Sequence, residues 1–271
     1  TARYILGNLK DFNPDTDSVT YEDMTELDKW AIIQLGDLIE KSQEAYDKLD
    51  FHIVYHAVHN FCTIDMSSFY LDILKDRLYC EKADDVLRRS AQTVIYTVLR
   101  KITLLLAPIL SYTAEEIWSF MPQSEKYNNE SVFLNDISKL QENKADHSFV
   151  AKWDKIHEIR DDVNKVLELL RKDKTIGKSL EAKVVLGADG ELYDFLNTYL
   201  TELAPVFIVS QVELTKEIQS NTGLVAGLTV SVCHAEGEKC ERCWTYGKSV
   251  GTNSEHPTLC KRCARVMQEQ L

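Results

Sequence analysis

The sequence has no apolar segment long enough to cross a membrane. Its longest apolar run, residues 104–110, is far shorter than the roughly 20 residues that a membrane-spanning helix needs, and Pro108 interrupts it. No positively charged leader with an apolar core opens the chain, so secretion is not supported. With 44% hydrophobic and 27% charged residues, the composition is that of a globular protein without membrane segments. Its 271 residues suffice for two domains or more.

The motifs of common catalytic sites are also missing. The sequence contains no glycine-rich phosphate-binding loop, no nucleophile elbow and no His-Glu-x-x-His motif. Carboxylates that are neighbours in sequence, such as Glu115 and Glu116 or Asp161 and Asp162, point apart on a helix. They are more typical of solvated faces than of acid–base pairs. We therefore predict no catalytic residues in this chain.

Positive charge is scarce, which argues against an extended nucleic-acid track. The chain has 31 basic and 43 acidic residues, a net charge of -12, whereas proteins that neutralise many phosphates are usually rich in Lys and Arg. The deficit is uneven, because residues 237–271 hold six basic and four acidic residues. We therefore expect any nucleic-acid contact to be local and to lie in this last part of the sequence.

Four of the seven cysteines have the spacing of a metal site. Cys240-Glu-Arg-Cys243 and Cys260-Lys-Arg-Cys263 are two Cys-x-x-Cys pairs separated by sixteen residues, which is typical of a four-cysteine zinc site. Four thiolates complete a tetrahedral site without an open position, so one structural Zn²⁺ is expected. The nearby Lys and Arg residues would also offset the negative charge of such a site. The alternative is two free pairs, or disulfides.

The remaining metal-type residues predict no second site. Cys62, Cys80 and Cys233 lie singly in largely apolar segments, which favours buried, unreactive thiols and fits a reducing cytoplasm. No carboxylate or cysteine pattern completes a site around the histidines of residues 51–60. We expect these to be exposed or hydrogen-bonded. They are His52, His56 and His59.

Apolar periodicity predicts a mainly α protein. We assign residues 1–140 to an up-down helical bundle, because its helices are joined by short connections. Thr113-Ala-Glu-Glu116 resembles a capping box for a short last helix, and the polar stretch 123–146 is predicted to be a linker or surface loop. The long helices are expected over residues 25–49, 51–79 and 84–107.

After this stretch the pattern becomes mixed. The order of elements predicts a small α+β domain over residues 147–235, followed by the zinc module at 236–271. A helix is expected first, then a short apolar strand, a second helix and two more strands. Their expected ranges are 147–174, 182–186, 191–203, 206–214 and 228–233.

The residues around the cysteines are similar to a known zinc module. Gly237-Glu-Lys-Cys-Glu-Arg-Cys-Trp244, followed by His256-Pro-Thr-Leu-Cys260-Lys-Arg-Cys263, resembles the carboxy-terminal module of bacterial isoleucyl-tRNA synthetases. A similar finger closes the formamidopyrimidine-type DNA glycosylases. The motif alone therefore implies nucleic-acid binding without choosing the substrate.

The helical region resembles the anticodon-binding bundle of class I synthetases for branched aliphatic amino acids. The similarity lies in residues 1–9, in Asn60-Phe-Cys through Ser68-Phe-Tyr-Leu-Asp72, and in Leu106-Ala-Pro-Ile through Ala114-Glu-Glu-Ile-Trp118. The order of bundle, small α+β junction domain and four-cysteine module is that of the isoleucyl enzymes. Valyl enzymes share the bundle but typically end in a coiled-coil arm. A glycosylase would need its own catalytic amino-terminal residue and a different helical domain.

The resemblance implies the tRNA-binding part of an enzyme that joins isoleucine to tRNA(Ile) with ATP. The chain has no initiator Met and opens inside an apolar pattern, so we expect that it is cut from a longer protein whose catalytic and editing domains lie upstream. The isolated chain is predicted to be non-catalytic and, without a sustained heptad seam, monomeric. The alternative from another class is a zinc-ribbon interaction module without an RNA role, in which the metal only stabilises a short tail.

Arg242 and Trp244 are the candidates for RNA contact. Both flank Cys243, so a closed metal site would fix their backbone. A guanidinium group can bind phosphate or base edges, and an indole can stack on unpaired anticodon bases. The alternative is that Trp244 packs against the junction domain while Arg242 offsets thiolate charge.

Overall fold

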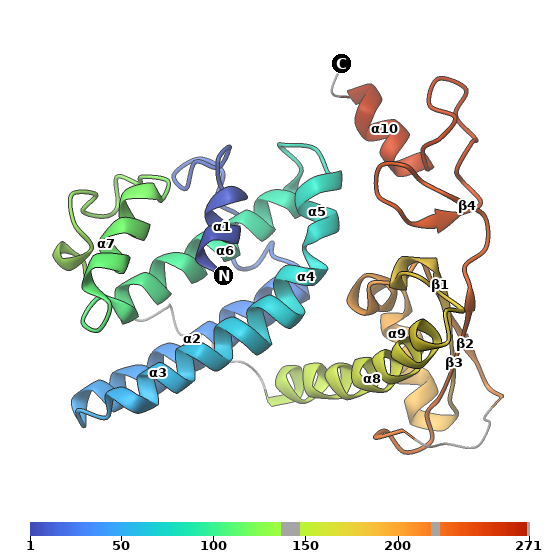
Figure 1. Cartoon of the computed structure of the whole chain (residues 1–271), viewed down its shortest axis with the longest axis horizontal. Helices are drawn as coiled ribbons and strands as arrows, with labels where there is room; N and C mark the ends of the chain where they lie inside the picture. Colours follow the sequence, from blue (N-terminus) through green and yellow to red (C-terminus); the bar gives the residue numbers. More distant parts are fainter. Residues whose placement is uncertain (137–146, 218–222, 270–271) are drawn as a thin grey trace. The chain divides into compact units, whose positions relative to one another are not determined.

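The computed structural model describes residues 1–136, 147–217 and 223–269. They form two compact units, Thr1–Asp146 and His147–Leu271 (Figure 1). The predicted mainly α fold with a small α+β part is confirmed. Across the described ranges, no helix combines the length and the apolar character that crossing a membrane requires.

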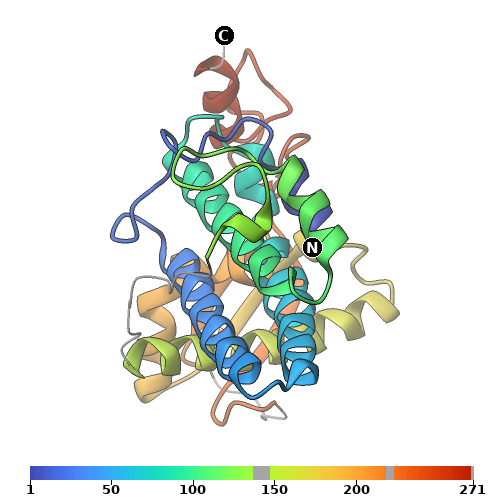
Figure 2. The same ribbon diagram turned by 90° about the vertical axis from the view of Figure 1, so that its left-hand side faces the viewer.

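The first unit is built around the two longest of its helices, α2 and α6. Helix α2 packs against α3 and α6, while α1 and α7 pack on α6. In Figure 2, α2 and α3 lie side by side as an antiparallel pair joined by a short turn. The elements are α1 Ala2–Gly7, α2 Glu26–Asp47, α3 Phe51–Asn60, η1 Phe61–Tyr70, α4 Leu71–Ile73, α5 Lys75–Cys80, α6 Val86–Leu106, α7 Ser111–Phe120 and η2 Val132–Leu134.

The expected helix over residues 51–79 is interrupted by a π-helix, η1. Two serine hydroxyls donate to carbonyl oxygens five residues earlier, Ser67 to Cys62 and Ser68 to Thr63, each at 2.7 Å. These bonds have the five-residue span of the π-helix and so support the wider turn. The buried side chains of Phe61 and Met66 lie five residues apart in η1, whereas the sequence prediction assumed a continuous 3.6-residue period.

A buried carboxylate joins four elements of the first unit. Asp28 on α2 is 0% exposed and accepts hydrogen bonds from Tyr70 Oη at 2.6 Å and Ser90 Oγ at 2.6 Å. Arg77 on α5 completes the site with an ion pair at 3.1 Å. Burial raises the pKa of Tyr70, which therefore stays a donor to the carboxylate. A buried charge is tolerated when it is paired and hydrogen-bonded in this way.

Part of the predicted linker is packed structure. Val132 is 1% exposed, and the Ser124 hydroxyl donates to Asp15 at 2.6 Å. The Glu115 carboxylate accepts hydrogen bonds from the Ser131 hydroxyl and from the Val132 amide. Residues 123–136 therefore form a loop that covers the helices, which is the surface-loop alternative of the prediction, and the rest of that stretch lies outside the described residues.

The predicted capping box at residues 113–116 is wrong. Helix α7 begins at Ser111, whose hydroxyl donates to the carbonyl oxygen of Ala107 at 3.0 Å. Glu115, which is expected to be near the end of the box, binds the segment at residues 131–132 instead. The helix thus starts two residues before Thr113, which lies inside its first turn and cannot serve as the N-cap.

The second unit contains a three-stranded sheet with two helices. Its strand order is β2-β1-β3, with β1 parallel to β2 through the crossover helix α9 and antiparallel to β3. Helix α9 packs on β2, α8 on β3, and the helices touch each other. The elements are α8 His147–Lys172, η3 Ser179–Glu181, β1 Ala182–Gly187, α9 Gly190–Phe207, β2 Gln211–Thr215 and β3 Thr229–His234.

The strand expected over residues 206–214 is shorter than predicted. Val206 and Phe207 are the last residues of α9, where they are 4% and 1% exposed. Ile208 has a left-handed backbone, φ 56°, and ends the helix. The β-branched composition favours a strand, but burial of these side chains from a helix outweighs local propensity.

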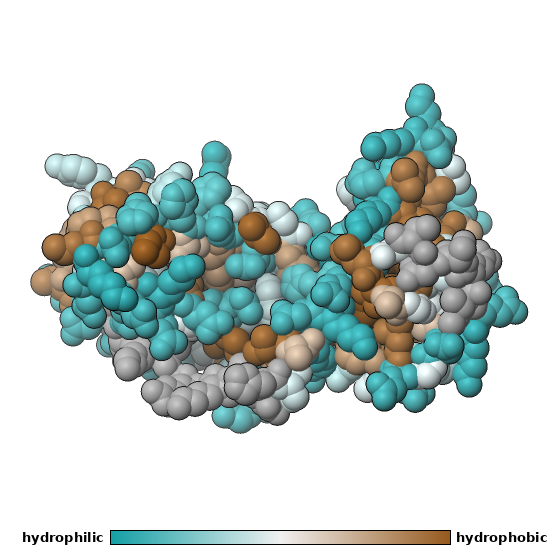
Figure 3. Space-filling view, turned by 90° about the horizontal axis from the view of Figure 1, so that it is seen from below, coloured by the Kyte–Doolittle hydropathy of each residue, from teal (hydrophilic) through white to brown (hydrophobic). Residues whose placement is uncertain are grey.

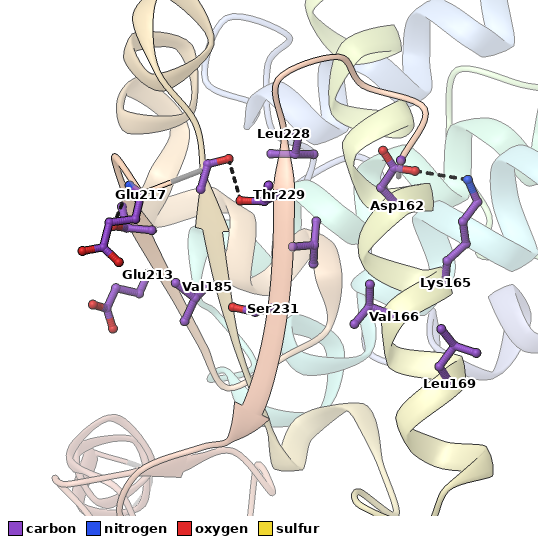
Figure 4. A pocket seen from close by; sticks show the side chains of 14 residues that line it. Asp162, Lys165, Val166, Leu169, Val185, Glu213, Glu217, Leu228, Thr229 and Ser231 are labelled. Carbon is purple, nitrogen blue, oxygen red and sulfur yellow. Dashed lines mark hydrogen bonds and ion pairs between the residues drawn. The ribbon is translucent and has the colours of Figure 1, made fainter. Parts of the chain in front are cut away.

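Asp162 is not on a solvated face, contrary to the sequence prediction. It is 3% exposed and accepts hydrogen bonds from the amides of Leu224, at 2.7 Å, and Val225, at 3.0 Å. Lys165 Nζ lies 3.1 Å from the same carboxylate (Figure 4). Burial opposes its ionisation, but these bonds and Lys165 lower the pKa of Asp162. A Cβ on Gly223 would lie 2.3 Å from the carboxylate, so glycine permits this close approach.

The three single cysteines are not equally buried. Cys80 is buried, and burial raises the pKa of the half-buried Cys62. The prediction of a buried thiol is wrong for Cys233, which is exposed. It lies on β3, an edge strand, where side chains alternate between the two faces of the sheet.

Candidate metal centre and nucleic-acid interface

A short hairpin carries the first cysteine pair. Strand β4, Glu238–Lys239, pairs with β5, Tyr246–Gly247, in antiparallel fashion. Between them the Cys240 amide donates to Thr245 O and the Trp244 amide donates to Cys240 O, both at 2.9 Å. Trp244 takes a left-handed backbone, φ 67°. This tight turn directs the two sulfur atoms to one place.

The second pair lies at the start of α10, Lys261–Glu269. Cys260 directly precedes this helix, and its amide donates a hydrogen bond to Cys240 Sγ at 3.3 Å. The Glu241 amide donates to Thr258 O at 3.2 Å, which joins the hairpin to the segment before α10. Sequence-distant cysteines are thus held together by backbone contacts as well as by their own side chains.

The four sulfur atoms converge with the spacing of a tetrahedral zinc site. The Sγ atoms of Cys240, Cys243, Cys260 and Cys263 all lie within 4.8 Å of one another. Those of Cys243 and Cys260 are 3.8 Å apart. Four sulfurs at about 2.3 Å from a zinc ion would be separated by about 3.8 Å. Within the described ranges, this is the one group of three or more such ligand residues close enough to share an ion.

The electrostatics of the sulfurs also fit a dication. A hydrogen bond from Cys263 lowers the pKa of Cys243 to about 4, while burial raises the pKa of Cys260. The hydrogen bond between Cys263 and Cys243 raises the pKa of Cys263. One thiolate therefore opposes the ionisation of its neighbours. A divalent cation would remove this opposition and allow all four sulfurs to ionise.

Arg242 and Trp244 lie on either side of Cys243 with different surroundings. Arg242 Nη1 lies 3.8 Å from Cys263 Sγ, so its charge offsets that of the sulfur cluster. Trp244 is 50% exposed, with Lys178 Nζ 4.7 Å from the ring centroid. Each residue therefore has a contact within this unit, and Trp244 remains half-exposed to solvent.

The hairpin docks on the start of β2 through polar contacts that the sequence did not reveal. The Tyr246 amide donates to Ser210 Oγ at 2.7 Å. Gln211 and Glu236 exchange two hydrogen bonds, from Gln211 Nε2 to Glu236 O at 2.8 Å and from the Glu236 amide to Gln211 Oε1 at 3.0 Å. The partners are distant in sequence, and no local motif marks them.

Two lysines hold the Glu236 carboxylate at this junction. Lys248 Nζ lies at 2.5 Å and Lys183 Nζ at 3.1 Å. These hydrogen bonds, that of Lys248 first, lower the pKa of Glu236 to about 2. The group is exposed, so its contribution to stability is screened by solvent.

The remaining surface features of the molecule are less suited to nucleic acid. A cavity of about 540 Å³ in the second unit is lined by side chains of α8 and the sheet, including the carboxylates of Asp162, Glu213 and Glu217 (Figure 4). One lysine, Lys165, faces these three carboxylates, so the lining keeps an excess of negative charge that would repel phosphate. In the first unit, the three histidines of α3 are exposed, as predicted. Hydrophobic and hydrophilic residues are mixed on the face shown in Figure 3.

Two family models match the chain. The first is the anticodon-binding domain of tRNA ligases, over residues 28–186. The second is the zinc finger found in FPG and IleRS, over residues 237–266. With the convergence of four sulfurs, this second match confirms the predicted zinc module. The first match continues from α2 to the end of β1 and so crosses the boundary between the two units.

Curated relatives match the chain over its whole length. It is 50% identical over 273 residues to the isoleucine–tRNA ligase of Syntrophotalea carbinolica, covering 100% of this chain and 29% of that protein. The corresponding enzyme of Geobacter sulfurreducens is 49% identical over 99% of the chain and 29% of the relative. That of Caldanaerobacter subterraneus is 46% identical over 100% of the chain and 30% of the relative. The chain thus spans less than a third of the length of these relatives.

Proposed function

This chain belongs to the tRNA-ligase anticodon-binding family, in its isoleucine–tRNA ligase branch, and from that premise we propose that it binds the anticodon region of tRNA(Ile). The observation that carries the proposal is the half-exposed Trp244 on a turn next to a sulfur of the metal centre. The turn lies in a basic module of a chain whose net charge is -12. Such a module offers a local contact for RNA instead of a long electrostatic track.

The parent enzyme would join isoleucine to tRNA(Ile) with ATP, as a class I synthetase of the cytoplasm. This chain would supply binding and no chemistry, because its sequence contains none of the catalytic motifs considered above. ATP and isoleucine would bind to other parts of the longer protein. Three functional parts are proposed, a helical bundle over residues 1–140, a junction domain over 147–235 and a zinc module over 236–271. The chain is expected to be monomeric.

One Zn²⁺ would be held by Cys240, Cys243, Cys260 and Cys263. When bound, the ion supplies a closed tetrahedral link between the hairpin and the start of α10, without an open position for a substrate. The protein's own contribution is the turn that fixes Trp244 beside the cluster and the guanidinium of Arg242 beside Cys263. Both RNA-contacting groups would therefore be positioned before RNA binds.

Trp244 would stack on an unpaired anticodon base, and Arg242 would bind phosphate or a base edge in addition to its contact with sulfur. A stacking ring recognises single-stranded RNA whose bases are splayed out, which is the state of an anticodon loop. The hydrogen bonds of the hairpin fix the backbone at Trp244, which would limit the entropy that this residue loses on binding.

Titration of the chain with tRNA(Ile) and with an unrelated tRNA tests the proposal. Tighter binding of tRNA(Ile) is expected, and Arg242→Ala should weaken it while zinc content and thermal melting stay unchanged. Trp244→Ala should also weaken it, and Tyr199→Ala is the matched control for this loss of a ring, because the Tyr199 ring likewise lies under a lysine, with Lys152 Nζ at 5.0 Å, but away from the cysteines in sequence. Equal affinity for both tRNAs would contradict the proposal and favour a zinc-ribbon module without an RNA role.

A further inference from the structure

A lysine from outside the zinc module lies over the ring of Trp244. The Nζ atom of Lys178, in the segment before β1, is 4.7 Å from the ring centroid. Lys239 of β4 adds a second ammonium group at 5.4 Å. Both distances are within the roughly 6 Å over which a cation is attracted to an aromatic ring. The exposed indole thus has two positive charges beside it, from two separate parts of the sequence.

These two charges are available to a ligand. In the part of the chain that the structure describes, neither Lys178 nor Lys239 forms an ion pair with a carboxylate. Lys183 and Lys248 of the same unit, in contrast, are both paired with Glu236. An ammonium group without a carboxylate partner can bind a phosphate without first breaking an ion pair.

The backbone near Lys178 is connected to the zinc hairpin. The Ser210 hydroxyl donates to Leu180 O, two residues after Lys178, and accepts from the Tyr246 amide of β5 at 2.7 Å. One side chain therefore bridges the segment of Lys178 and the hairpin of Trp244. The two residues are presented by a connected framework although they are far apart in sequence.

The charge of the segment around Lys178 is unusual for this chain. Residues 171–178 contain four basic residues and one acidic residue, whereas the whole chain carries a net charge of -12. Residues 237–271 also have more basic than acidic residues. Two basic segments of an otherwise acidic protein thus meet at Trp244. A local concentration of positive charge of this kind is suited to a phosphate contact.

We propose that Lys178 binds a backbone phosphate next to the RNA base that stacks on Trp244, so that the RNA site extends from the zinc module onto the segment before β1. This inference rests on the proposed function, because it requires RNA at Trp244. The flexible stem of lysine allows the ammonium group to lie over the ring in the free chain and to reach phosphate in the complex. Phosphate contacts position RNA without reading its sequence, so Lys178 contributes affinity and not the choice of anticodon.

The salt dependence of tRNA(Ile) binding by the full chain tests this proposal. Loss of one single-strand phosphate contact in Lys178→Ala should make the slope of log affinity against log salt shallower by about 0.7. The loss of affinity should then be roughly 2.6-fold larger at 50 mM than at 200 mM salt. Lys178→Arg should keep the slope. The loss should be the same for a tRNA(Ile) with an altered anticodon.

Lys155→Ala is the matched control. Its Nζ atom lies 4.6 Å from the ring of Phe195 in the same unit, so the variant removes the same charge and the same kind of ring contact. An unchanged slope in Lys178→Ala would overturn the inference. An equal change in Lys155→Ala would also overturn it, because the effect would then come from net charge. The inference would also be overturned if Lys178→Ala lost tRNA affinity equally at all salt concentrations and melted at a lower temperature. Lys178 would then only support the ring of Trp244.

Failure of the proposed function has a different outcome. In that case the unmodified chain would not prefer tRNA(Ile), or Trp244→Ala would bind as tightly as the unmodified chain, and the inference about Lys178 would be refuted as well. A different result refutes only the inference about Lys178. In that result the unmodified chain prefers tRNA(Ile) and Trp244→Ala weakens binding, but Lys178→Ala leaves the salt slope unchanged.

Discussion

The helical unit and the zinc module are stabilised by different means. In the helical unit, whole apolar faces are buried, with Leu35, Val94 and Leu105 all 0% exposed. Among the described residues of the module, 237–269, the buried side chains are three cysteines, Ala264 and Val266. So few apolar groups cannot offset the loss of chain entropy on folding. One part therefore folds by its core, and the other depends on its metal.

Replacing one sulfur should reveal this difference most clearly. We expect Cys263→Ser to abolish tight zinc binding and unfold the module, because the binding energy of structural zinc, on the order of 10 kcal/mol, becomes folding energy. The helices of the first unit should persist. Metal analysis and circular dichroism measure both effects.

Cys233→Ser is the control for that variant, because Cys233 is exposed and lies outside the cluster. It should bind one zinc ion per chain and melt normally. A Cys263→Ser protein that keeps a full zinc ion would show that Cys263 is not a required ligand. A variant with melted helices would show that the two parts are not stabilised separately.

Removing the buried carboxylate of Asp28 should destabilise the helical unit and leave the zinc module intact. Asp28→Ala leaves Arg77 without its ion-pair partner and removes the acceptor of the Tyr70 and Ser90 hydroxyls. We expect the helical unit to lose about 3 kcal/mol of stability, which urea unfolding can measure. Zinc content should stay at one ion per chain. Loss of zinc in this variant would mean that the units unfold together.

The loss of the exposed indole should affect binding and not folding. Trp244→Ala should weaken tRNA(Ile) binding by about 1–3 kcal/mol, the usual effect of removing a stacking aromatic ring. Zinc content and melting should be unchanged, and the loss should be smaller for a tRNA with a changed anticodon. Affinity that survives, or that falls only together with zinc, would place the RNA contact elsewhere.

The smallest expected effect is on the ion pairs of Glu236, at the junction between the hairpin and the sheet. The pKa of Glu236 is lowered to about 2 by Lys248 and Lys183, so the stability it contributes is present above its ordinary pKa near 4.5 and is lost as pH falls through about 2. A titration followed by NMR should give this low midpoint. In Lys248→Ala the midpoint should rise, and an identical midpoint would argue against the ion pair in solution.

The parts of the molecule that the sequence could predict are those set by local spacing. The two Cys-x-x-Cys pairs are such a case, because each pair forms one turn and the loop length brings the turns together. The long apolar stripes of α2 and α6 are another, since a helix repeats every 3.6 residues. In both cases the residues that matter are close in sequence.

The contacts that escaped prediction join residues far apart in sequence. Asp162 was expected in solvent, but the amides of Leu224 and Val225 approach it from another part of the chain. The contact of Lys178 with Trp244 likewise has no local signal. Such contacts follow from tertiary packing, and composition and periodicity do not contain that information.

The left-handed backbone at Trp244 has a consequence for how this position tolerates substitution. A φ of 67° is easy for glycine but costs an ordinary side chain about 1 kcal/mol. A Trp244→Gly variant should therefore have a more stable turn and yet bind RNA less tightly, since the ring is gone. Selection for thermal stability alone would favour glycine at this turn, whereas selection for RNA binding would retain tryptophan despite the strain.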